Sequence, residues 1–208
     1  WVARALDTAK HHEDPVKREE ADEFVQLMTP IVKALFTDLG FETASIGMQV
    51  YGGHGFIRDH GMEQYVCDSR ISMIYEGTNG VQALDLVGRK MPAHMGRYLR
   101  SFFHPALAEI DAAIDDDRLS DLVQPLSKAF GGLQLCTAEI AQKGLRDPEE
   151  AGAAATEYLR LFGLVALGVM WLRTAKVAHA ALDGECDDPE FYKAKLVTAN
   201  FYMTRILP

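Results

Sequence analysis

Apolar residues recur every three or four positions along most of the chain, and this spacing predicts helices. The first stripe consists of Phe24, Leu27, Met28, Ile31, Val32, Leu35, Leu39 and Ile46. Thr29 and Pro30 can serve as the N-cap and first residue of a helix, so we expect a helix to begin there and run to about Val50. The glycine-rich stretch 52–55 would then end it.

Local start and stop signals predict the helices that follow. Asp147-Pro148-Glu149-Glu150 combines an N-cap, a proline at the first helical position and early acidic residues, and Asp188-Pro189 repeats this signal. No alternating strand pattern of useful length is present. The further predicted helical segments are 62–71, 78–90, 98–114, 120–140, 148–182 and 189–206. We therefore predict an all-α fold of two antiparallel helical bundles, residues 1–91 and residues 92–208.

Composition narrows the class of protein. Of the 208 residues, 48% are hydrophobic and 25% are charged, which is an ordinary globular balance. The net charge of −9 and the absence of a basic patch argue against a nucleic-acid-binding protein. The longest apolar run, residues 161–172, is too short to span a bilayer and fits a buried helix. We expect neither a nucleic-acid partner nor a membrane span.

The positions of the cysteines and histidines indicate which cellular compartment the protein occupies and whether it binds a metal ion. Cys67, Cys136 and Cys186 are widely spaced and form no CxxC motif. This usage favours a reducing compartment, and we expect a cytoplasmic protein without a disulfide framework. The histidines lack partners at metal-ligand spacing, so no metal site is predicted.

Two segments interrupt the helical pattern with residues that could carry chemistry. The stretch 49–56 places three glycines after a helix, where backbone amides can approach a ligand, although a simple helix C-cap and turn has the same pattern. The stretch 74–80 places Glu76 just before a helix N-terminus. An acid there can complement the helix dipole without any catalytic role.

Taken together, the two segments resemble the C-terminal helical domain of the acyl-CoA dehydrogenase family. The matching motifs, in order, are Gln49-x-x-Gly52-Gly53-x-Gly55-Phe56, Asp68-Ser69-Arg70-Ile71 and Ile74-Tyr75-Glu76-Gly77-Thr78. The resemblance is strong over residues 30–91. The variant motifs look most like the branch that includes 3-methylmercaptopropionyl-CoA dehydrogenase, whose additional C-terminal helical domain residues 92–208 would supply. Since the chain begins with Trp1, we expect a piece of a longer protein that is inactive alone.

The resemblance implies an enzyme that oxidises an acyl-CoA thioester to the trans-2-enoyl-CoA, a reaction of fatty acid metabolism. Glu76 matches the catalytic base, which removes the α-proton while the β-hydrogen passes as hydride to flavin N5. Its backbone N–H would also donate to the thioester oxygen. Tyr75 and Gly77 would line the substrate site. Such a proton transfer needs a base in a dry pocket and stabilisation of the enolate oxygen.

The resemblance also implies FAD as cofactor and a set of partners. Gln49, Gly52 and Gly53 match residues that contact the adenosine diphosphate part of FAD in a neighbouring subunit, so a homodimer or dimer of dimers is expected. Thr78 matches a residue near FAD on the other side. An electron-transferring flavoprotein would accept the electrons. Arg70 matches a family arginine, and we interpret it as structural. A pairing with Asp68 near the turn and a contact with a ligand are equally open.

Two alternatives stay open. An acyl-CoA oxidase shares the fold and the base but passes electrons to oxygen. A non-enzymatic helical module for oligomerisation or partner binding would also account for the long amphipathic helices.

Overall fold

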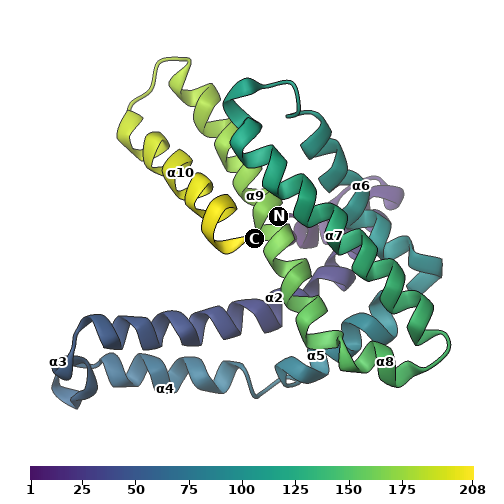
Figure 1. Cartoon of the computed structure of the whole chain (residues 1–208), viewed down its shortest axis with the longest axis horizontal. Coiled ribbons are helices and arrows are strands. Elements are labelled where there is room, and N and C mark those ends of the chain that lie inside the picture. The colour runs from purple at the N-terminus through teal and green to yellow at the C-terminus, as the bar shows by residue number, and fades with distance from the viewer.

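The computed structural model describes residues 1–208, which form ten α-helices and no β-strand (Figure 1). The all-α prediction is confirmed. The α-helices are α1 (Val2–His11), α2 (Pro15–Val50), α3 (Gly53–Phe56), α4 (Met62–Ser72), α5 (Asn79–Asp85), α6 (Arg97–Asp111), α7 (Ser120–Gly144), α8 (Pro148–Ala153), α9 (Ala155–Leu182) and α10 (Pro189–Phe201). Short 3-10 turns are η1 (Arg58–His60), η3 (Ala93–Gly96) and η4 (Asp117–Leu119), and π-helical turns are η2 (Leu86–Lys90) and η5 (Tyr202–Ile206).

The central helix of the core is α9. It is apolar around its whole circumference, which is typical of a buried helix, and it packs against α2, α5, α6, α7 and α10. Two glycines allow this close packing. A Cβ atom at Gly163 would lie 2.5 Å from Leu35 Cδ2, and one at Gly168 would lie 2.8 Å from Leu126 Cδ1. The sequence of α9 is therefore matched to neighbours on several sides.

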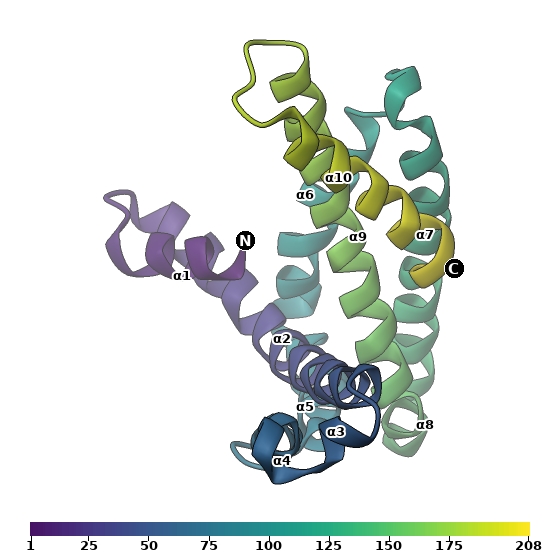
Figure 2. The ribbon, with the colours of Figure 1, turned by 90° about the vertical axis from the view of Figure 1, so that its left-hand side faces the viewer.

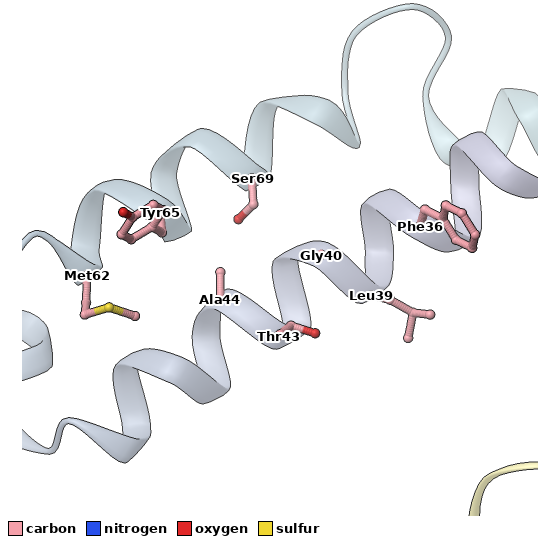
Figure 3. Close-up of a pocket in the computed structure, with 8 residues that line it drawn as sticks. All are labelled: Phe36, Leu39, Gly40, Thr43, Ala44, Met62, Tyr65 and Ser69. Atoms are coloured by element: carbon pink, nitrogen blue, oxygen red, sulfur yellow. The ribbon is translucent and has the colours of Figure 1, made fainter. Parts of the chain in front are cut away.

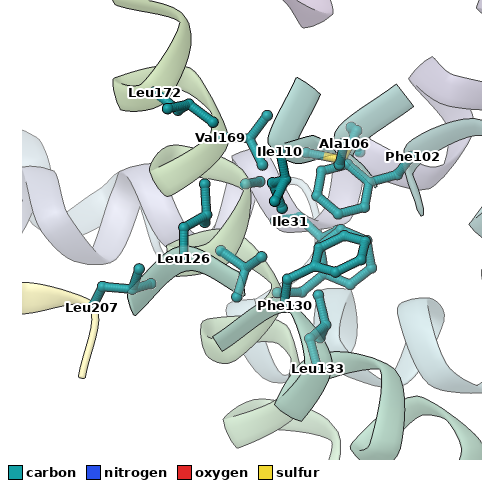
Figure 4. Close-up of a cluster of buried hydrophobic side chains, with 14 of the residues drawn as sticks. Ile31, Phe102, Ala106, Ile110, Leu126, Phe130, Leu133, Val169, Leu172 and Leu207 are labelled. Atoms are coloured by element: carbon teal, nitrogen blue, oxygen red, sulfur yellow. The ribbon is translucent and has the colours of Figure 1, made fainter. Parts of the chain in front are cut away.

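One hydrophobic core joins the two predicted bundles. A single cluster of 32 buried residues includes Leu27 and Ile31 of α2, Phe102 of α6 and Phe162 of α9. Figure 4 shows side chains from α2, α6, α7 and α9 pointing toward one another in this cluster. Buried packing thus continues across residues 91 and 92, and the division into units 1–91 and 92–208 stays a prediction.

The long helix α2 differs from the sequence prediction. It begins at Pro15 rather than at Thr29 and Pro30, so the predicted break is wrong. Asp14 caps the helix by accepting a hydrogen bond from a backbone N–H of the first turn, and Thr29 Oγ1 donates to Val25 O instead of capping. Pro30 is fully buried. Packing against the core compensates for the backbone hydrogen bond that proline cannot make.

The predicted helix 148–182 is two helices. Asp147 caps α8 as expected, with Oδ1 accepting from Glu149 N at 3.0 Å. The chain then turns at Ala154, and α9 begins at the next residue. The turn lets α8 pack back against the end of α7, where Ala151 Cβ lies only 2.9 Å from the position of a Cβ on Gly144. The other predicted helices are present with close boundaries.

The second half of α2, the turn with α3 and η1, and α4 form a two-helix arm, defined here as residues 36–73. The arm projects from the helical bundle (Figures 1 and 2). No residue of α2 beyond Leu35 and no residue of α4 is buried. Large apolar side chains exposed on the arm are Phe36, Ile46, Val50, Tyr51, Phe56, Ile57, Tyr65 and Ile71. Exposed apolar surface of this extent is typical of a region that contacts other protein elements.

Two helices, α2 and α9, are long and apolar enough to cross a membrane by length and composition alone. Half of the most apolar window of α9, and 39% of that of α2, is buried inside the fold. Because core helices of globular proteins pass the same test, this is weak evidence for a membrane span.

Candidate active site

The residues singled out by sequence lie in two places, next to the base of the arm and at its tip. Tyr75, Glu76, Gly77 and Thr78 lie together at its base, in the loop between α4 and α5, whereas Gln49, Gly52 and Gly53 lie at its tip. Lys33 of α2 contacts the basal loop. Gln49 is 16 residues further along the same helix, or about 24 Å at 1.5 Å per residue. The structure therefore brings the first group together and keeps it apart from the second.

Glu76 and Gly77 form a left-handed turn. Their φ angles are 56° and 83°. This region suits glycine, whereas a glutamate there is strained by roughly 1–2 kcal/mol. A Cβ on Gly77 would also lie 2.9 Å from Gln82 Nε2. The positive φ angle thus favours glycine after Glu76, and a larger residue would also displace the Gln82 side chain.

Side chains from α2 and α5 hold the two carbonyls of this turn. Gln82 Nε2 donates to Glu76 O at 3.1 Å, and Lys33 Nζ donates to Gly77 O at 2.7 Å. Lys33 Nζ also donates to Asn79 Oδ1 at 2.8 Å. The asparagine amide then donates to Asp38 Oδ1 at 2.6 Å. The turn is therefore attached to α2 through a continuous polar network.

Most of this network was not predicted from the sequence. Lys33 stands beside the apolar stripe of α2, next to the buried Ala34, and its partner is 44 residues away. Gln82 lies on the inner side of α5 and reaches back six residues. A lysine adjoining a buried stripe is a weak local signal, and neither contact could be assigned without the fold.

The polar groups of Glu76 that face outward have no partner in the chain. Its side chain is exposed, and its carboxylate makes no hydrogen bond or ion pair. The backbone N–H groups of Glu76 and Gly77 donate to no atom of the chain. Thr78 caps α5, with Oγ1 accepting from Val81 N at 3.4 Å. The turn thus presents an acceptor carboxylate and free N–H donors side by side.

The glycines at the tip of the arm have different physical explanations. A Cβ on Gly55 would collide with Met48 O and lie 2.9 Å from Tyr51 Cβ, so packing accounts for this glycine. A Cβ on Gly52 or Gly53 would meet nothing within 4 Å. Gly52 has φ 62°, which glycine favours, but no contact in the chain requires Gly53. Bare backbone at an exposed turn fits close approach by the diphosphate part of a dinucleotide cofactor.

The predicted Asp68–Arg70 pair is not present. Asp68 Oδ1 accepts from Gln64 Nε2 at 2.7 Å, whereas the Arg70 guanidinium lies 5.6 Å from the centroid of the Phe41 ring. Residues two apart on a helix point to different sides, which separates the two side chains. Arg70 instead connects α4 to α2, so a structural role within the arm is what the geometry supports.

A shallow groove runs along the arm between α2 and α4 (Figure 3). Its volume is about 530 Å³. The residues lining it are Phe36, Leu39, Gly40, Thr43, Ala44, Met62, Tyr65 and Ser69. Figure 3 shows Met62 and Ser69 of α4 and Ala44 of α2 directed into the space between the helices. The groove lies between the two groups of predicted site residues and was not predicted.

Two ionisable groups with shifted pKa values lie on the packed helices of residues 92–208, the partly buried Glu109 and the buried Tyr158. Partial burial opposes ionisation of Glu109, but Lys176 and Arg173 outweigh it and hold the pKa of this carboxyl below its ordinary value. Burial raises the pKa of the Tyr158 phenol, against the opposing effect of its hydrogen bond with Thr137. These groups lie within packed helices, so the shifts indicate structural contacts.

No set of three or more histidine, cysteine, aspartate or glutamate side chains gathers at metal-binding geometry. The three cysteines are unpaired.

Two family models match the chain. The model described as "Acyl-CoA dehydrogenase, C-terminal domain" matches residues 2–91, and the model described as "Acetyl-CoA dehydrogenase C-terminal like" matches residues 106–208. Together they account for nearly all of the sequence.

Curated relatives agree with these matches. The chain is 34% identical to 3-methylmercaptopropionyl-CoA dehydrogenase of Ruegeria pomeroyi, over 97% of this chain and 34% of that protein. It is 30% identical to the broad-specificity linear acyl-CoA dehydrogenase FadE5 of Mycobacterium tuberculosis, over 88% of this chain and 31% of that protein. The chain therefore spans about a third of the length of these relatives.

A solved structure has a similar fold. It is Caenorhabditis elegans ACDH-11 in complex with C11-CoA, with a TM-score of 0.77 and 18% sequence identity. The match covers 98% of this chain and 32% of the other.

Proposed function

Because the chain belongs to the acyl-CoA dehydrogenase family, we propose that it is the C-terminal part of an FAD-dependent enzyme that converts an acyl-CoA thioester to its trans-2-enoyl-CoA. One observation carries this proposal. Glu76 offers an unpaired carboxylate and an unpaired backbone N–H from the same residue, in a turn that two other helices hold.

The two groups of Glu76 match what the reaction requires. The α-proton of a thioester is weakly acidic, and negative charge develops on the thioester oxygen as the proton leaves. The Glu76 carboxylate accepts that proton as general base, and its N–H donates a hydrogen bond to the oxygen. FAD, when bound, would take up the β-hydrogen as hydride. Since Glu76 is exposed in this chain, we expect elements beyond these 208 residues to exclude water from it.

Neighbouring residues would complete the site. Tyr75 is half exposed beside Glu76, and we propose that Tyr75 and Gly77 line the acyl-CoA site. The Thr78 hydroxyl accepts only a long hydrogen bond from Val81 N, so its own proton is free to be donated toward FAD.

We propose that Gln49, Gly52 and Gly53 contact the FAD of a neighbouring subunit. Gln49 lies about 24 Å along α2 from Lys33 at the base of the arm, and this separation allows the two ends of the arm to contact different FAD molecules. The open backbone at Gly53 supports contact with the diphosphate part of FAD. A homodimer is then the minimum assembly, and a dimer of dimers has the same contacts.

The names of the relatives support a proposal for the substrate class. The names of two of them specify 3-methylmercaptopropionyl-CoA and linear acyl-CoA. We propose a short or medium acyl-CoA as substrate, an electron-transferring flavoprotein as electron acceptor and the cytoplasm as location.

The test uses the full-length protein that contains this chain. Its flavin absorbance is recorded without oxygen before and after addition of 3-methylmercaptopropionyl-CoA or butanoyl-CoA, for the wild type and for Glu76→Gln. We expect the wild-type flavin band to bleach, whereas the variant binds FAD but is not reduced. Glu42→Gln, which alters an exposed and unpaired carboxylate on the arm, is the matched control and should be reduced normally. Normal reduction of Glu76→Gln would refute the assignment of the base.

A further inference from the structure

Two adjacent peptide groups in the Glu76 turn are held from outside the turn. The peptide between residues 76 and 77 is held through Glu76 O by Gln82, and the peptide between residues 77 and 78 is held through Gly77 O by Lys33. A peptide group is planar, so these hydrogen bonds also orient the N–H groups of Gly77 and Thr78, and through them the turn that follows the Glu76 N–H. Together the two contacts set the backbone angles on either side of Gly77.

This support has a physical reason. A glutamate with φ 56° is in a strained conformation, which persists only where the surroundings over-determine it. Gly77 can adopt many other conformations at low cost, so the turn would relax easily without an external partner. The contact from Lys33 is the shorter of the two, at 2.7 Å, and comes from a charged donor, which makes it the stronger.

The Lys33 ammonium has only neutral hydrogen-bond partners, as the Lys90 ammonium does. Its side chain is half-buried, yet its ammonium is paired with no carboxylate and donates only to neutral oxygens, those of Gly77 and Asn79. Partial burial of an ammonium without a counter-ion is costly, and an apolar side chain at this place on α2 would pack without that cost. What the lysine provides that an apolar side chain would not is its two hydrogen bonds, to Gly77 O and to Asn79 Oδ1.

Asn79 fixes the position of the Lys33 ammonium. Its side-chain oxygen accepts from Lys33 Nζ, and its amide nitrogen donates to Asp38 Oδ1 and, at 3.0 Å, to Thr37 Oγ1. The asparagine thus holds one of the three N–H groups of the ammonium, and a second donates to Gly77 O.

We propose that Lys33 is a positioning residue for Glu76. By holding the Gly77 carbonyl, its ammonium keeps the turn in the conformation that directs the Glu76 carboxylate and N–H at the substrate thioester. This inference rests on the proposed function of Glu76 as the base.

The experiment compares variants of the full-length flavoprotein. Lys33→Met removes the donor and keeps the length of the side chain, and Lys33→Gln is a second neutral variant in case the first does not fold. Lys90→Met is the matched control, because Lys90 is a part-buried lysine that donates to Gln26 of α2 at 2.8 Å, away from the turn. Lys33→Arg retains the charge and the donors.

Two measurements separate positioning from a merely structural role. The first is the rate of flavin reduction by butanoyl-CoA, together with the apparent Kd of the substrate. The second is the infrared frequency of the thioester carbonyl of bound crotonoyl-CoA, the enoyl product. This frequency reports the hydrogen bond from the Glu76 N–H and involves no turnover.

We expect both Lys33 neutral variants to bind FAD and to lose about 10- to 100-fold in reduction rate, the effect of a misplacement of about 1 Å. The apparent Kd should change little, and the carbonyl frequency should shift toward that of free crotonoyl-CoA. Lys33→Arg should restore much of the rate, and Lys90→Met should match the wild type.

Other outcomes would overturn the inference. Wild-type rates and carbonyl frequency in both neutral variants would show that Lys33 positions nothing. Equal losses of reduction rate in the Lys33 and Lys90 variants would show that the Lys33 contact only stabilises the fold. Glu76→Gln is measured alongside to tell failure of the proposed function from failure of the positioning role. Normal flavin reduction in Glu76→Gln would refute the proposed function itself. An inactive Glu76→Gln together with a fully active Lys33→Met would refute the positioning role alone.

Discussion

The guanidinium carbon of Arg173 on α9 lies 4.2 Å from the ring centroid of Trp1, at the beginning of α1. Arg173 Nε also donates to Glu109 Oε1 at 3.0 Å. The aromatic ring, the cation and the carboxylate thus connect the first residue of the chain to α9 and α6. This contact joins elements from both sides of residue 91, as the shared hydrophobic core does.

Glu109 should stabilise the fold in a pH-dependent way. Its pKa is lowered below the ordinary value of 4.5 because the contacts with Lys176 and Arg173 outweigh partial burial. A carboxyl whose pKa is lowered by folding contributes stability that is fully present above the pKa of the unfolded chain and is lost as pH falls through the lower folded value. Glu109→Gln should therefore lower Tm near pH 7, and the difference from wild type should shrink below pH 4.5.

Thermal unfolding of the full-length protein between pH 3 and pH 8 would test this. Glu42→Gln, at an exposed and unpaired carboxyl within α2, is the control. A Tm difference for Glu109→Gln that stays constant over this pH range would contradict the prediction.

Replacing Gly53 or Gly55, at the tip of the arm, with alanine should change the stability of the fold by different amounts. Gly53→Ala adds a methyl group in open space, so the free energy of unfolding should change by less than about 1 kcal/mol, while FAD affinity should fall. Gly55→Ala forces the methyl against Met48 O and should destabilise the fold by about 1–3 kcal/mol. Urea unfolding and FAD titration of the full-length protein measure the two effects. Unchanged FAD affinity in Gly53→Ala would count against the cofactor contact.

The packing of α9 against α2 depends on Gly163. Alanine at this position would bring its methyl carbon to 2.5 Å from Leu35 Cδ2, and moving the buried leucine should cost about 1–3 kcal/mol. Gly131, in the interior of α7, has no atom within 4 Å of the place that an alanine methyl group would occupy. Gly131→Ala should therefore stabilise the protein by about 0.5–1 kcal/mol through helix propensity. Urea unfolding that gives the same sign for both substitutions would contradict this account.

Tyr158 is buried, and its hydroxyl is 2.7 Å from Thr137 Oγ1. Burial raises the pKa of this phenol above its ordinary value of 10.0. A group whose pKa is raised by folding contributes stability that is present below the unfolded pKa and is lost as pH rises toward the folded value. The wild type should thus lose stability above pH 10 relative to Tyr158→Phe.

At neutral pH, Tyr158→Phe should cost about 1 kcal/mol, because Thr137 Oγ1 keeps its hydrogen bond to Leu133 O. Unfolding measured at pH 7 and at high pH tests both statements. A cost for Tyr158→Phe that is independent of pH would show that burial does not disfavour the ionised phenol.

Features that depend on neighbouring residues were predictable from the amino-acid pattern. The caps at Asp147 and Asp188 accept hydrogen bonds from backbone groups two or three residues away, so their signal is complete within a short segment. The same holds for the cap at Thr78. The order of motifs that ends in Glu76 was enough to place the chain in its family and to single out the candidate base.

Other features depend on residues far apart in the chain, and no local pattern carries them. Pro30 lies within a continuous helix because the core packs around it, although proline more often starts one. The contact between Lys33 and Gly77 crosses 44 residues, and it exists only because α2 passes the loop before α5. Backbone hydrogen bonding over three or four residues sets where most helices begin. Which helices meet, and which carbonyls a side chain can reach, follows from burying apolar surface across the whole fold.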